Sequence, residues 1–399
     1  MDFCKNHINA RYFTSVEEIP EEIWHQLDCT HSVYFSPKYL SVIAKNHPKI
    51  QFFYLVLFDE QNLAKAFATI QIIDFYLDRV QNNFQSLINR IKCFGRSLGI
   101  ISPEKPFKIL TCGNTFVSGE HGIFIKNDQD KPKVLNELAK SLVNFVNTDK
   151  KLRKQISAFM LKDFIKESLV ISDELHECKY SSFNVEPNMI MQVDTDWNDF
   201  NDYLSAMKTK FRVKAKKAIE RSCFLEVVSV DENTLQTYKN EMQELYNNVC
   251  TKAGFNLGEF SIDTFKELKK NLGKDYIVQA YFLNSHLVGF LSGMINNQTL
   301  DAHFVGIDYQ YNREYAIYQR MLYDYVQIAI ERDLKTINFG RTASEIKSSV
   351  GAQPQDLTIY LRHKNTISNK ILGMFIHKLQ PTPFRQNFPF KVKNLVQQT

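Results

Sequence analysis

One short pattern occurs twice in this chain, and it constrains the fold more than any other feature. Residues 35–46 and 260–271 both begin with Phe-Ser, carry apolar residues at matching positions and end with Lys-Asn. Each has the spacing of a helix that starts after a serine cap. Each is followed by two runs of β-branched and aromatic residues broken by a polar turn, which is typical of a β-hairpin. A helix followed by a hairpin, found twice, predicts two copies of one module.

The length and the apolar content of the chain fit two such modules. The chain has 399 residues, of which 44% are hydrophobic, and its 31 Phe and 18 Tyr supply enough apolar surface for two cores. We expect an N-terminal module over residues 1–185, a C-terminal module over residues 186–365 and a basic amphipathic tail over residues 366–399.

The second half shows how the hairpin continues. A strand is expected over residues 299–305, a helix over 314–332, and further strands over 335–339 and 357–362. In the helix, the apolar spacing predicts a solvent-facing stripe of Arg320, Asp324, Gln327 and Glu331. Strand, helix, strand and strand after an antiparallel hairpin predict the α/β class, with a mixed twisted sheet flanked by helices.

The net charge of +5 is concentrated in two segments. Residues 208–221 hold seven basic residues against one acid, Glu220, and residues 364–399 hold six basic residues and no acid. Two positive segments on an otherwise acidic chain favour an anionic partner, either a phosphate-bearing donor, a nucleic acid or a membrane surface. The bland alternative is that both segments are ordinary solvated faces.

Cysteine usage and the N-terminal sequence bear on the compartment. The seven cysteines are widely spaced and form no Cys-x-x-Cys pair, which argues against a disulfide framework and against a zinc site. Residues 1–13 are polar, without the apolar run of a signal peptide. We therefore expect a cytoplasmic protein, with peripheral contact to the inner face of the membrane left open.

Three stretches resemble a known family. Residues 197–212 contain a helix that ends in Lys-x-Lys-x-Arg, residues 337–352 contain Phe-Gly-Arg-Thr followed by Lys and Gly, and residues 112–122 form a weaker match. Together with the order of elements, over about residues 30–363, they resemble the GNAT acyltransferases. The second half is similar to the FemAB-related, peptidoglycan biosynthesis and recognition branch, whose members carry two GNAT modules in tandem.

The resemblance implies a function and a pair of co-substrates. It implies transfer of an acyl group from acyl-CoA, or of an amino acid from aminoacyl-tRNA, to an amine acceptor, without a metal and without a covalent enzyme intermediate. One alternative is a transferase dependent on aminoacyl-tRNA that acts on a cell-wall precursor or a lipid amine. Another is a protein without catalysis that keeps the fold and docks on membrane or RNA. The oligomeric state is not indicated.

The Phe-Gly-Arg-Thr segment supplies candidate donor-binding residues. A glycine after a strand lets the backbone approach a ligand closely, and an arginine offers a planar fork suited to phosphate. Thr342 or Ser344 is expected to cap a short helix that has Glu345 in its first turn and ends at a glycine. The candidate donor-binding residues are Gly340, Arg341, Thr342, Lys347 and Gly351. The alternative is a surface loop with a glycine turn at each end.

Further candidates lie on either side of the expected helix. Residues 306–313 occupy the place where the family holds the coenzyme pyrophosphate, but the family's Arg/Gln-x-x-Gly-x-Gly/Ala pattern is missing. This departure argues against standard coenzyme A binding and leaves room for aminoacyl-tRNA or another acyl carrier beside acyl-CoA. The candidates for binding an anion or substrate are Lys208, Lys210, Arg212 and Arg313. The candidate catalytic bases are Asp301, His303 and Glu345, of which the first two share one side of their strand by alternation.

The segment 367–379 has an apolar face and basic neighbours. Its spacing predicts an amphipathic helix, consistent with a helix that lies on an anionic membrane. Packing of the same face against the body of the protein explains the pattern equally well.

Overall fold

The computed structural model describes residues 8–75, 107–253, 260–376 and 379–391. The chain divides into two compact units. Unit 1 comprises residues 1–186, 254–264 and 356–382, and unit 2 comprises residues 187–253, 265–355 and 383–399. Among the described residues, no helix is both long and apolar enough to cross a bilayer.

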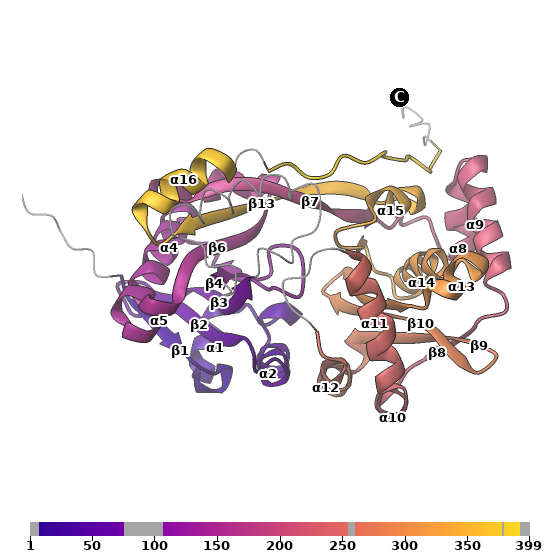
Figure 1. The fold of residues 1–399 in the computed structure, drawn as a ribbon, viewed down its shortest axis with the longest axis horizontal. Helices are drawn as coiled ribbons and strands as arrows, with labels where there is room; N and C mark the ends of the chain where they lie inside the picture. Colours follow the sequence, from indigo (N-terminus) through magenta and orange to yellow (C-terminus); the bar gives the residue numbers. More distant parts are fainter. Residues whose placement is uncertain (1–7, 76–106, 254–259, 377–378, 392–399) are drawn as a thin grey trace, which may run out of the picture. The chain divides into compact units, whose positions relative to one another are not determined.

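Unit 1 is built on a mixed sheet (Figure 1). Its strands lie in the order β1 (Ala10–Phe13), β2 (Gln51–Phe58), β3 (Ala64–Phe75), β4 (Phe107–Cys112), β6 (Ile156–Ile165) and β13 (Gln353–His363), with β5 (Ile123–Ile125) paired to β3. All neighbours are antiparallel except β4 and β6, which are parallel.

Helices pack against this sheet, and local sequence sets where they begin. The main ones are α1 (Glu21–Leu27), α2 (Pro37–Asn46), α4 (Lys131–Thr148), α5 (Lys150–Gln155), α6 (Leu169–Ser172), α7 (Glu174–Glu177) and α16 (Thr366–Ile376). The Ser36 hydroxyl accepts a bond from the Tyr39 amide, and the Asp130 carboxylate accepts one from the Lys133 amide. Helices α2 and α4 therefore each start at a side chain that satisfies a free N–H group.

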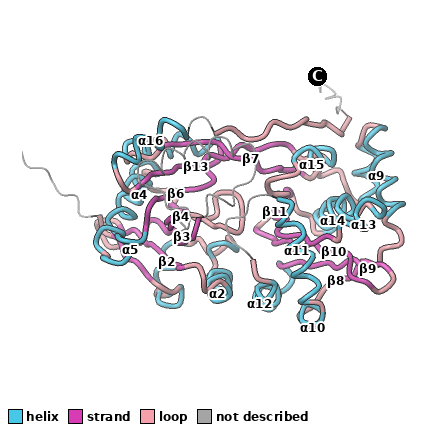
Figure 2. Tube along the Cα trace, viewed as in Figure 1, coloured by secondary structure: helices cyan, strands magenta, loops and turns pink. Residues whose placement is uncertain are grey.

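The strands of unit 2 also pair in both parallel and antiparallel fashion (Figure 2). Its strands lie in the order β8 (Glu226–Ser229), β9 (Tyr276–Leu283), β10 (His286–Asn296), β11 (Thr299–Ile307), β12 (Thr336–Asn338) and β7 (Ser181–Gln192). Its helices are α8 (Phe200–Ala206), α9 (Thr209–Arg221), α10 (Glu232–Thr237), α11 (Lys239–Ala253), α12 (Ile262–Leu272), α13 (Tyr309–Tyr315), α14 (Ile317–Glu331) and α15 (Ser344–Val350). The first residues of α12 fall in unit 1.

The two units have the same order of strands and connections. In each unit an antiparallel hairpin, β2–β3 or β9–β10, is followed by a strand that pairs in parallel with the next one across a helix. That crossover helix is α4 in unit 1 and α14 in unit 2. The expected duplication of a mixed, helix-flanked module is therefore present.

One expected strand lies in the other unit. The strand expected over residues 357–362 was assigned to the C-terminal module, but β13 pairs antiparallel with β6, from Leu357 opposite Ile165 to His363 opposite Ala158, in unit 1. The expected tail over residues 366–399 is also shared, because residues 366–382 group with unit 1 and residues 383–399 with unit 2. The strand with which β13 pairs is determined by residues far away in the sequence. The apolar alternation of residues 357–362 therefore does not indicate its pairing partner.

Helix α14 corrects a second expectation. Asp324, predicted to face solvent, is only 5% exposed. Its carboxylate accepts a hydrogen bond from the Tyr281 hydroxyl at 2.6 Å and from Arg320 Nε at 2.7 Å. Burial raises the pKa of Asp324, while Arg320 and Tyr281 act in the opposite direction. The predicted solvent-facing stripe is therefore interrupted at Asp324, because Tyr281 of β9 packs against this residue.

Loss of the Asp324 carboxylate should destabilise unit 2. We expect Asp324→Ala to lower the free energy of unfolding by about 3 kcal/mol, because it leaves a half-buried guanidinium and a buried hydroxyl without their acceptor. Urea denaturation followed by circular dichroism measures the change. The matched control is Glu331→Ala on the same helix, where the exposed site predicts a change within about 0.5 kcal/mol. Equal effects of the two variants would contradict this account.

Candidate functional site

A β-bulge in β11 marks the candidate site in unit 2. Leu291 of β10 pairs with Val305 and Gly293 pairs with Ala302, so two residues of β11, His303 and Phe304, face Ser292 alone. The Ser292 hydroxyl lies 3.0 Å from both the amide nitrogen and the carbonyl oxygen of Phe304. Bulges of this kind redirect side chains and are frequent beside active sites.

The bulge gathers aromatic groups around His303. The Tyr276 hydroxyl lies 3.4 Å from His303 Nδ1, and the rings of Phe265 and Phe304 pack against the imidazole. From the other side of the bulge, the Tyr325 hydroxyl donates to the Ser292 carbonyl at 2.7 Å. The position of His303 is therefore set by contacts from β9, α12 and β11 and, through Ser292, from α14.

Strands β11 and β12 are paired only at their beginning. Their register runs from Thr299 opposite Thr336 to Asp301 opposite Asn338, and β11 continues to Ile307 without β12. At the last pair, Asn338 Nδ2 donates to Asp301 Oδ1 at 2.9 Å, and the Gly340 amide donates to Asn338 Oδ1 at 2.9 Å. Asp301 is 3% exposed. The carboxylate of Asp301, a predicted base, therefore binds Asn338 at the point where the pairing of β11 with β12 ends.

The loop after β12 is strained. Gly340, Thr342 and Ala343 have φ angles of 68°, 65° and 50°. Glycine adopts such angles freely, but a β-branched threonine there costs on the order of 1–3 kcal/mol, and strain of this size is concentrated at functional sites. The expected cap by Thr342 or Ser344 is wrong, because α15 starts after left-handed Ala343 without a side-chain cap.

Lys347 holds the strained loop from within. Its side chain is buried, and its Nζ donates to the carbonyl oxygen of Gly340 at 3.2 Å and to that of Arg341 at 2.6 Å. Burial lowers the pKa of Lys347 to about 7, and a smaller burial effect lowers that of Arg341 to about 10. The ammonium expected to bind a donor is therefore already engaged by the loop itself.

The C-terminal segment fastens α15, which carries Lys347. The Asn387 amide donates to the Ser348 hydroxyl at 3.0 Å, and its side-chain nitrogen donates to the Glu345 carbonyl at 3.1 Å. The Phe390 ring lies over Gly351, where φ is 120° and a Cβ would collide with the ring. Gly351 ends α15 as expected, but it faces Phe390. Glu345 has an exposed side chain.

The predicted basic residues divide into two groups. Lys208 Nζ donates to the Phe388 carbonyl at 2.9 Å, and Arg212 donates to the Met207 carbonyl at 3.3 Å, so both secure the chain around α9. Lys210 and Arg313 are exposed. Their role in binding an anion stays a prediction.

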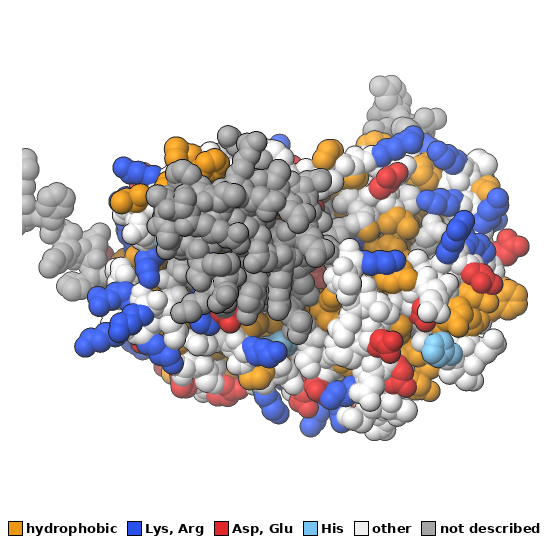
Figure 3. Space-filling model, in the orientation of Figure 1, with side chains coloured by type: hydrophobic (Ala, Val, Ile, Leu, Met, Phe, Trp, Pro, Cys, Tyr) orange, Lys and Arg blue, Asp and Glu red, His pale blue; other side chains and the backbone are white. Residues whose placement is uncertain are grey.

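Helix α9 presents a basic face that sequence charge had indicated. Its exposed cations are Lys210, Lys214, Lys216, Lys217 and Arg221. Figure 3 shows blue side chains gathered over the region that Figure 1 labels α9. The helix contacts α13 and α14, and Arg221 Nε donates to the Glu314 carbonyl at 2.8 Å. The basic face therefore adjoins the segment that follows β11.

The segment 306–313, in the place where the resemblance puts the coenzyme pyrophosphate, comprises the end of β11 and most of a helix. Residues after Asp308 form α13, which ends at left-handed Ala316, and α14 begins there. The Asn312 side chain accepts a hydrogen bond from the Tyr318 amide at 2.9 Å, which occupies one N–H group of the first turn of α14. Because Tyr309 and Tyr311 lie in α13, this end of the helix differs from a glycine-rich cradle.

The corresponding place in unit 1 is filled. Strands β4 and β6 pair up to Cys112 opposite Leu161, and Lys162 then donates to the carbonyls of Asn114 at 2.7 Å and Val117 at 3.0 Å. Its aliphatic stem covers Gly113, where a Cβ would collide with it, and its ammonium pairs with buried Asp163. We therefore place the candidate site in unit 2.

Comparisons with known proteins define the fold. FemX matches with 11% identity and a TM-score of 0.52 over 84% of this chain and 94% of its own. A tandem GNAT protein from the clavulanic acid biosynthesis pathway matches with 6% identity and a TM-score of 0.51 over 90% of this chain and 99% of its own. The chain therefore has the tandem GNAT-like fold, as the sequence resemblance indicated. No protein-family model and no curated protein matches it.

Removal of the Lys347 amine should release the loop rather than unfold the protein. Lys347→Met keeps the buried aliphatic stem but removes both hydrogen bonds that Nζ donates. We expect this to lower the free energy of local opening of residues 340–343 by about 2 kcal/mol. The loss of a buried cation offsets much of the effect on global stability. Hydrogen exchange measured by mass spectrometry should be roughly thirty-fold faster there, and unchanged in the exposed control Lys335→Met. Unaltered exchange at residues 340–343 would exclude the proposed clamp.

The buried amine also predicts how stability changes with pH. The folded chain releases the Lys347 proton near pH 7, whereas the unfolded chain retains it until about pH 10.4. Between these values the unfolded chain binds more protons, so the contribution of Lys347 to the unfolding free energy increases with pH, by up to about 1.4 kcal/mol per unit. Urea titrations of the wild type and Lys347→Met at about pH 7 and about pH 9 compare the two. We expect the unfolding free energy of the wild type, relative to that of Lys347→Met, to be higher at about pH 9 than at about pH 7. An unchanged difference would contradict the lowered pKa of Lys347.

Proposed function

We propose that unit 2 transfers an acyl or aminoacyl group from a phosphate-bearing carrier to an amine. The observation that carries the proposal is the combination of a bulge at His303 and Phe304 with the end of the β11–β12 pairing after Asp301. Beyond that pair, β12 does not extend along β11, and backbone groups of β11 there can bind an acyl carrier and polarise its carbonyl. The tandem GNAT-like fold supports this reading.

The reaction needs no covalent enzyme intermediate. The amine nitrogen attacks the thioester or ester carbonyl, an amide bond forms, and the thiol or hydroxyl of the carrier leaves. The amine must lose a proton, and the leaving group takes one up. We assign the first transfer to His303, a partly buried histidine at the bulge whose Nδ1 lies against the Tyr276 hydroxyl. Asp301 acts as a positioning residue, since its carboxylate holds Asn338.

The basic face of α9 supports a donor that carries several phosphates. The helix has 13 residues and therefore extends about 20 Å. A row of exposed cations of that length exceeds what one pyrophosphate requires and suits an RNA backbone. This observation favours aminoacyl-tRNA as a second candidate donor beside acyl-CoA.

Donor and transfer are tested with the full chain. It is incubated with acyl-CoA thioesters or with a pool of radiolabelled aminoacyl-tRNA, each with a panel of primary amines, and amide products are detected by mass spectrometry. Parallel binding titrations at several salt concentrations measure affinity for coenzyme A and for tRNA. An RNA donor predicts an affinity that falls steeply with salt. Failure of both donors to bind or react would overturn the proposal in favour of a protein that only docks.

Substitutions in unit 2 separate the two assigned roles. We expect His303→Gln to lower kcat by a factor of about 10² to 10⁴. Asp301→Asn keeps an oxygen that accepts the Asn338 bond, so its kcat should fall by less than about tenfold. His286→Gln, an exposed histidine on β10, is the control. A larger loss for Asp301→Asn than for His303→Gln would assign the base to Asp301 instead.

A further inference from the structure

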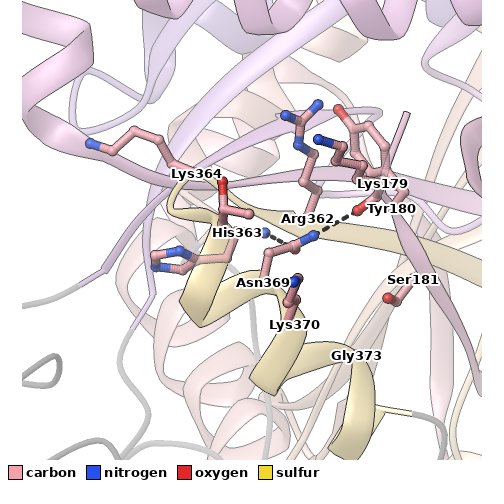
Figure 4. A pocket seen from close by; sticks show the side chains of 10 residues that line it. Lys179, Tyr180, Ser181, Arg362, His363, Lys364, Asn369, Lys370 and Gly373 are labelled. Carbon is pink, nitrogen blue, oxygen red and sulfur yellow. Dashed lines mark hydrogen bonds between the residues drawn. The ribbon is translucent and has the colours of Figure 1, made fainter. Parts of the chain in front are cut away.

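A second candidate site lies in unit 1, away from the proposed chemistry. A cavity of about 380 Å³ is bounded by the turn before β7, the end of β13 and one face of α16 (Figure 4). Its lining residues include Lys179, Arg362, Lys364, Lys370 and Asn369. The volume falls in the range typical of small-molecule sites.

The cavity is cationic. Four of the ten lining residues are lysine or arginine, and none is an aspartate or a glutamate. None of these four side chains forms an ion pair with a carboxylate among the residues that the structure describes. Burial and, second, the charge of Arg153 lower the pKa of Lys364. Positive groups brought together without a counter-charge repel one another, and a bound anion relieves that repulsion.

The cavity is held open by a bridge of hydrogen bonds. The Asn369 side-chain oxygen accepts from the His363 amide at 2.7 Å, and its nitrogen donates to the Lys179 carbonyl at 2.8 Å (Figure 4). The Arg362 guanidinium is anchored to the Cys178 carbonyl at 3.0 Å. Helix α16 is linked in this way to the end of β13 and to the turn before β7. A site whose walls are already joined loses little entropy when a ligand binds.

The ligand is bound by side chains rather than by the end of the helix. Asn365 Oδ1 accepts from the amides of Ile367 at 2.9 Å and Ser368 at 3.2 Å, so the first turn of α16 is capped from within. Arg362 and Lys364 donate to the carbonyls of Cys178 and Arg153, so the exposed Lys179 and Lys370 are the groups left to neutralise an anion. Lysine and arginine side chains recognise phosphate in this manner.

Apolar side chains on α16 identify the source of the phosphate. Ile367 is 70% exposed and Met374 is 63% exposed. They lie two helical turns apart on one stripe that flanks Lys370, and Figure 3 shows orange side chains over the position of α16. A large aliphatic pair beside a cationic cavity matches the border between phosphate headgroups and acyl chains. Exposed aromatic rings, which a surface for stacking RNA bases requires, are not among the cavity residues, where Tyr180 is buried.

We propose that the cavity beside α16 binds the phosphate of an anionic phospholipid while Ile367 and Met374 enter the membrane interface. The site specifies the surface of unit 1 that meets a membrane. It concerns unit 1 alone and does not depend on the reaction assigned to unit 2. The contribution of each cation near an anionic surface is on the order of 1 kcal/mol, so a few such groups with an apolar pair give reversible binding.

Vesicle binding of the full chain tests the proposal. Sedimentation with vesicles of phosphatidylglycerol and phosphatidylcholine, against phosphatidylcholine alone, should show binding only to the anionic vesicles. Lys179→Glu with Lys370→Glu should weaken it at least tenfold, whereas Lys45→Glu with Lys49→Glu, an exposed pair in and after α2 with the same charge change, should weaken it less than threefold. Equal weakening by the two pairs would overturn the site.

Two further measurements distinguish binding of a lipid headgroup from binding of free phosphate. Ile367→Ser with Met374→Ser should weaken binding to anionic vesicles about tenfold without altering the melting temperature, since both side chains are exposed. Glycerol 3-phosphate and inorganic phosphate at millimolar concentration should compete only weakly. Full competition by either, together with unchanged vesicle binding of the serine variant, would assign the cavity to a soluble phosphate and overturn the lipid proposal.

Discussion

A single buried amine determines the shape of the candidate site in unit 2. Lys347 donates to two consecutive carbonyls, those of Gly340 and Arg341, and so fixes a loop in which Thr342 and Ala343 are left-handed. Backbone strain of this kind persists only when surrounding contacts over-determine it. Asn338 secures the start of the loop and the C-terminal segment secures α15, so the contacts of three separate chain segments meet at this loop.

The two units share a buried lysine that binds a loop, but the two lysines lie in different places. Each contains a buried lysine whose ammonium donates to two loop carbonyls: Lys162 in unit 1 and Lys347 in unit 2. In unit 1 the lysine stem and its loop fill the place beyond the parallel strands, next to Gly113. In unit 2 the lysine approaches from α15 and leaves β11 to continue beyond its partner. We propose that the duplication yields one unit for the transfer reaction and one whose basic cavity binds an anion.

Sequence patterns succeeded where the cause is local. Both hairpins, the start of α2 at Ser36 and the end of α15 at Gly351 follow from alternation and from the conformations that serine and glycine allow. Patterns misled where distant groups decide. Asp324 has the spacing of a solvent-facing residue, but Tyr281 of β9 reaches its carboxylate.

Sequence alone determined that the chain repeats one helix-flanked module with mixed strand pairing, because periodicity, turns and caps are properties of neighbouring residues. Tertiary structure alone decided which unit receives β13, which side chains the bulge at His303 brings together, and which cations stay available for an anion. These outcomes depend on pairing and burial between residues far apart in the chain. Their free energies come from contacts that no local pattern records.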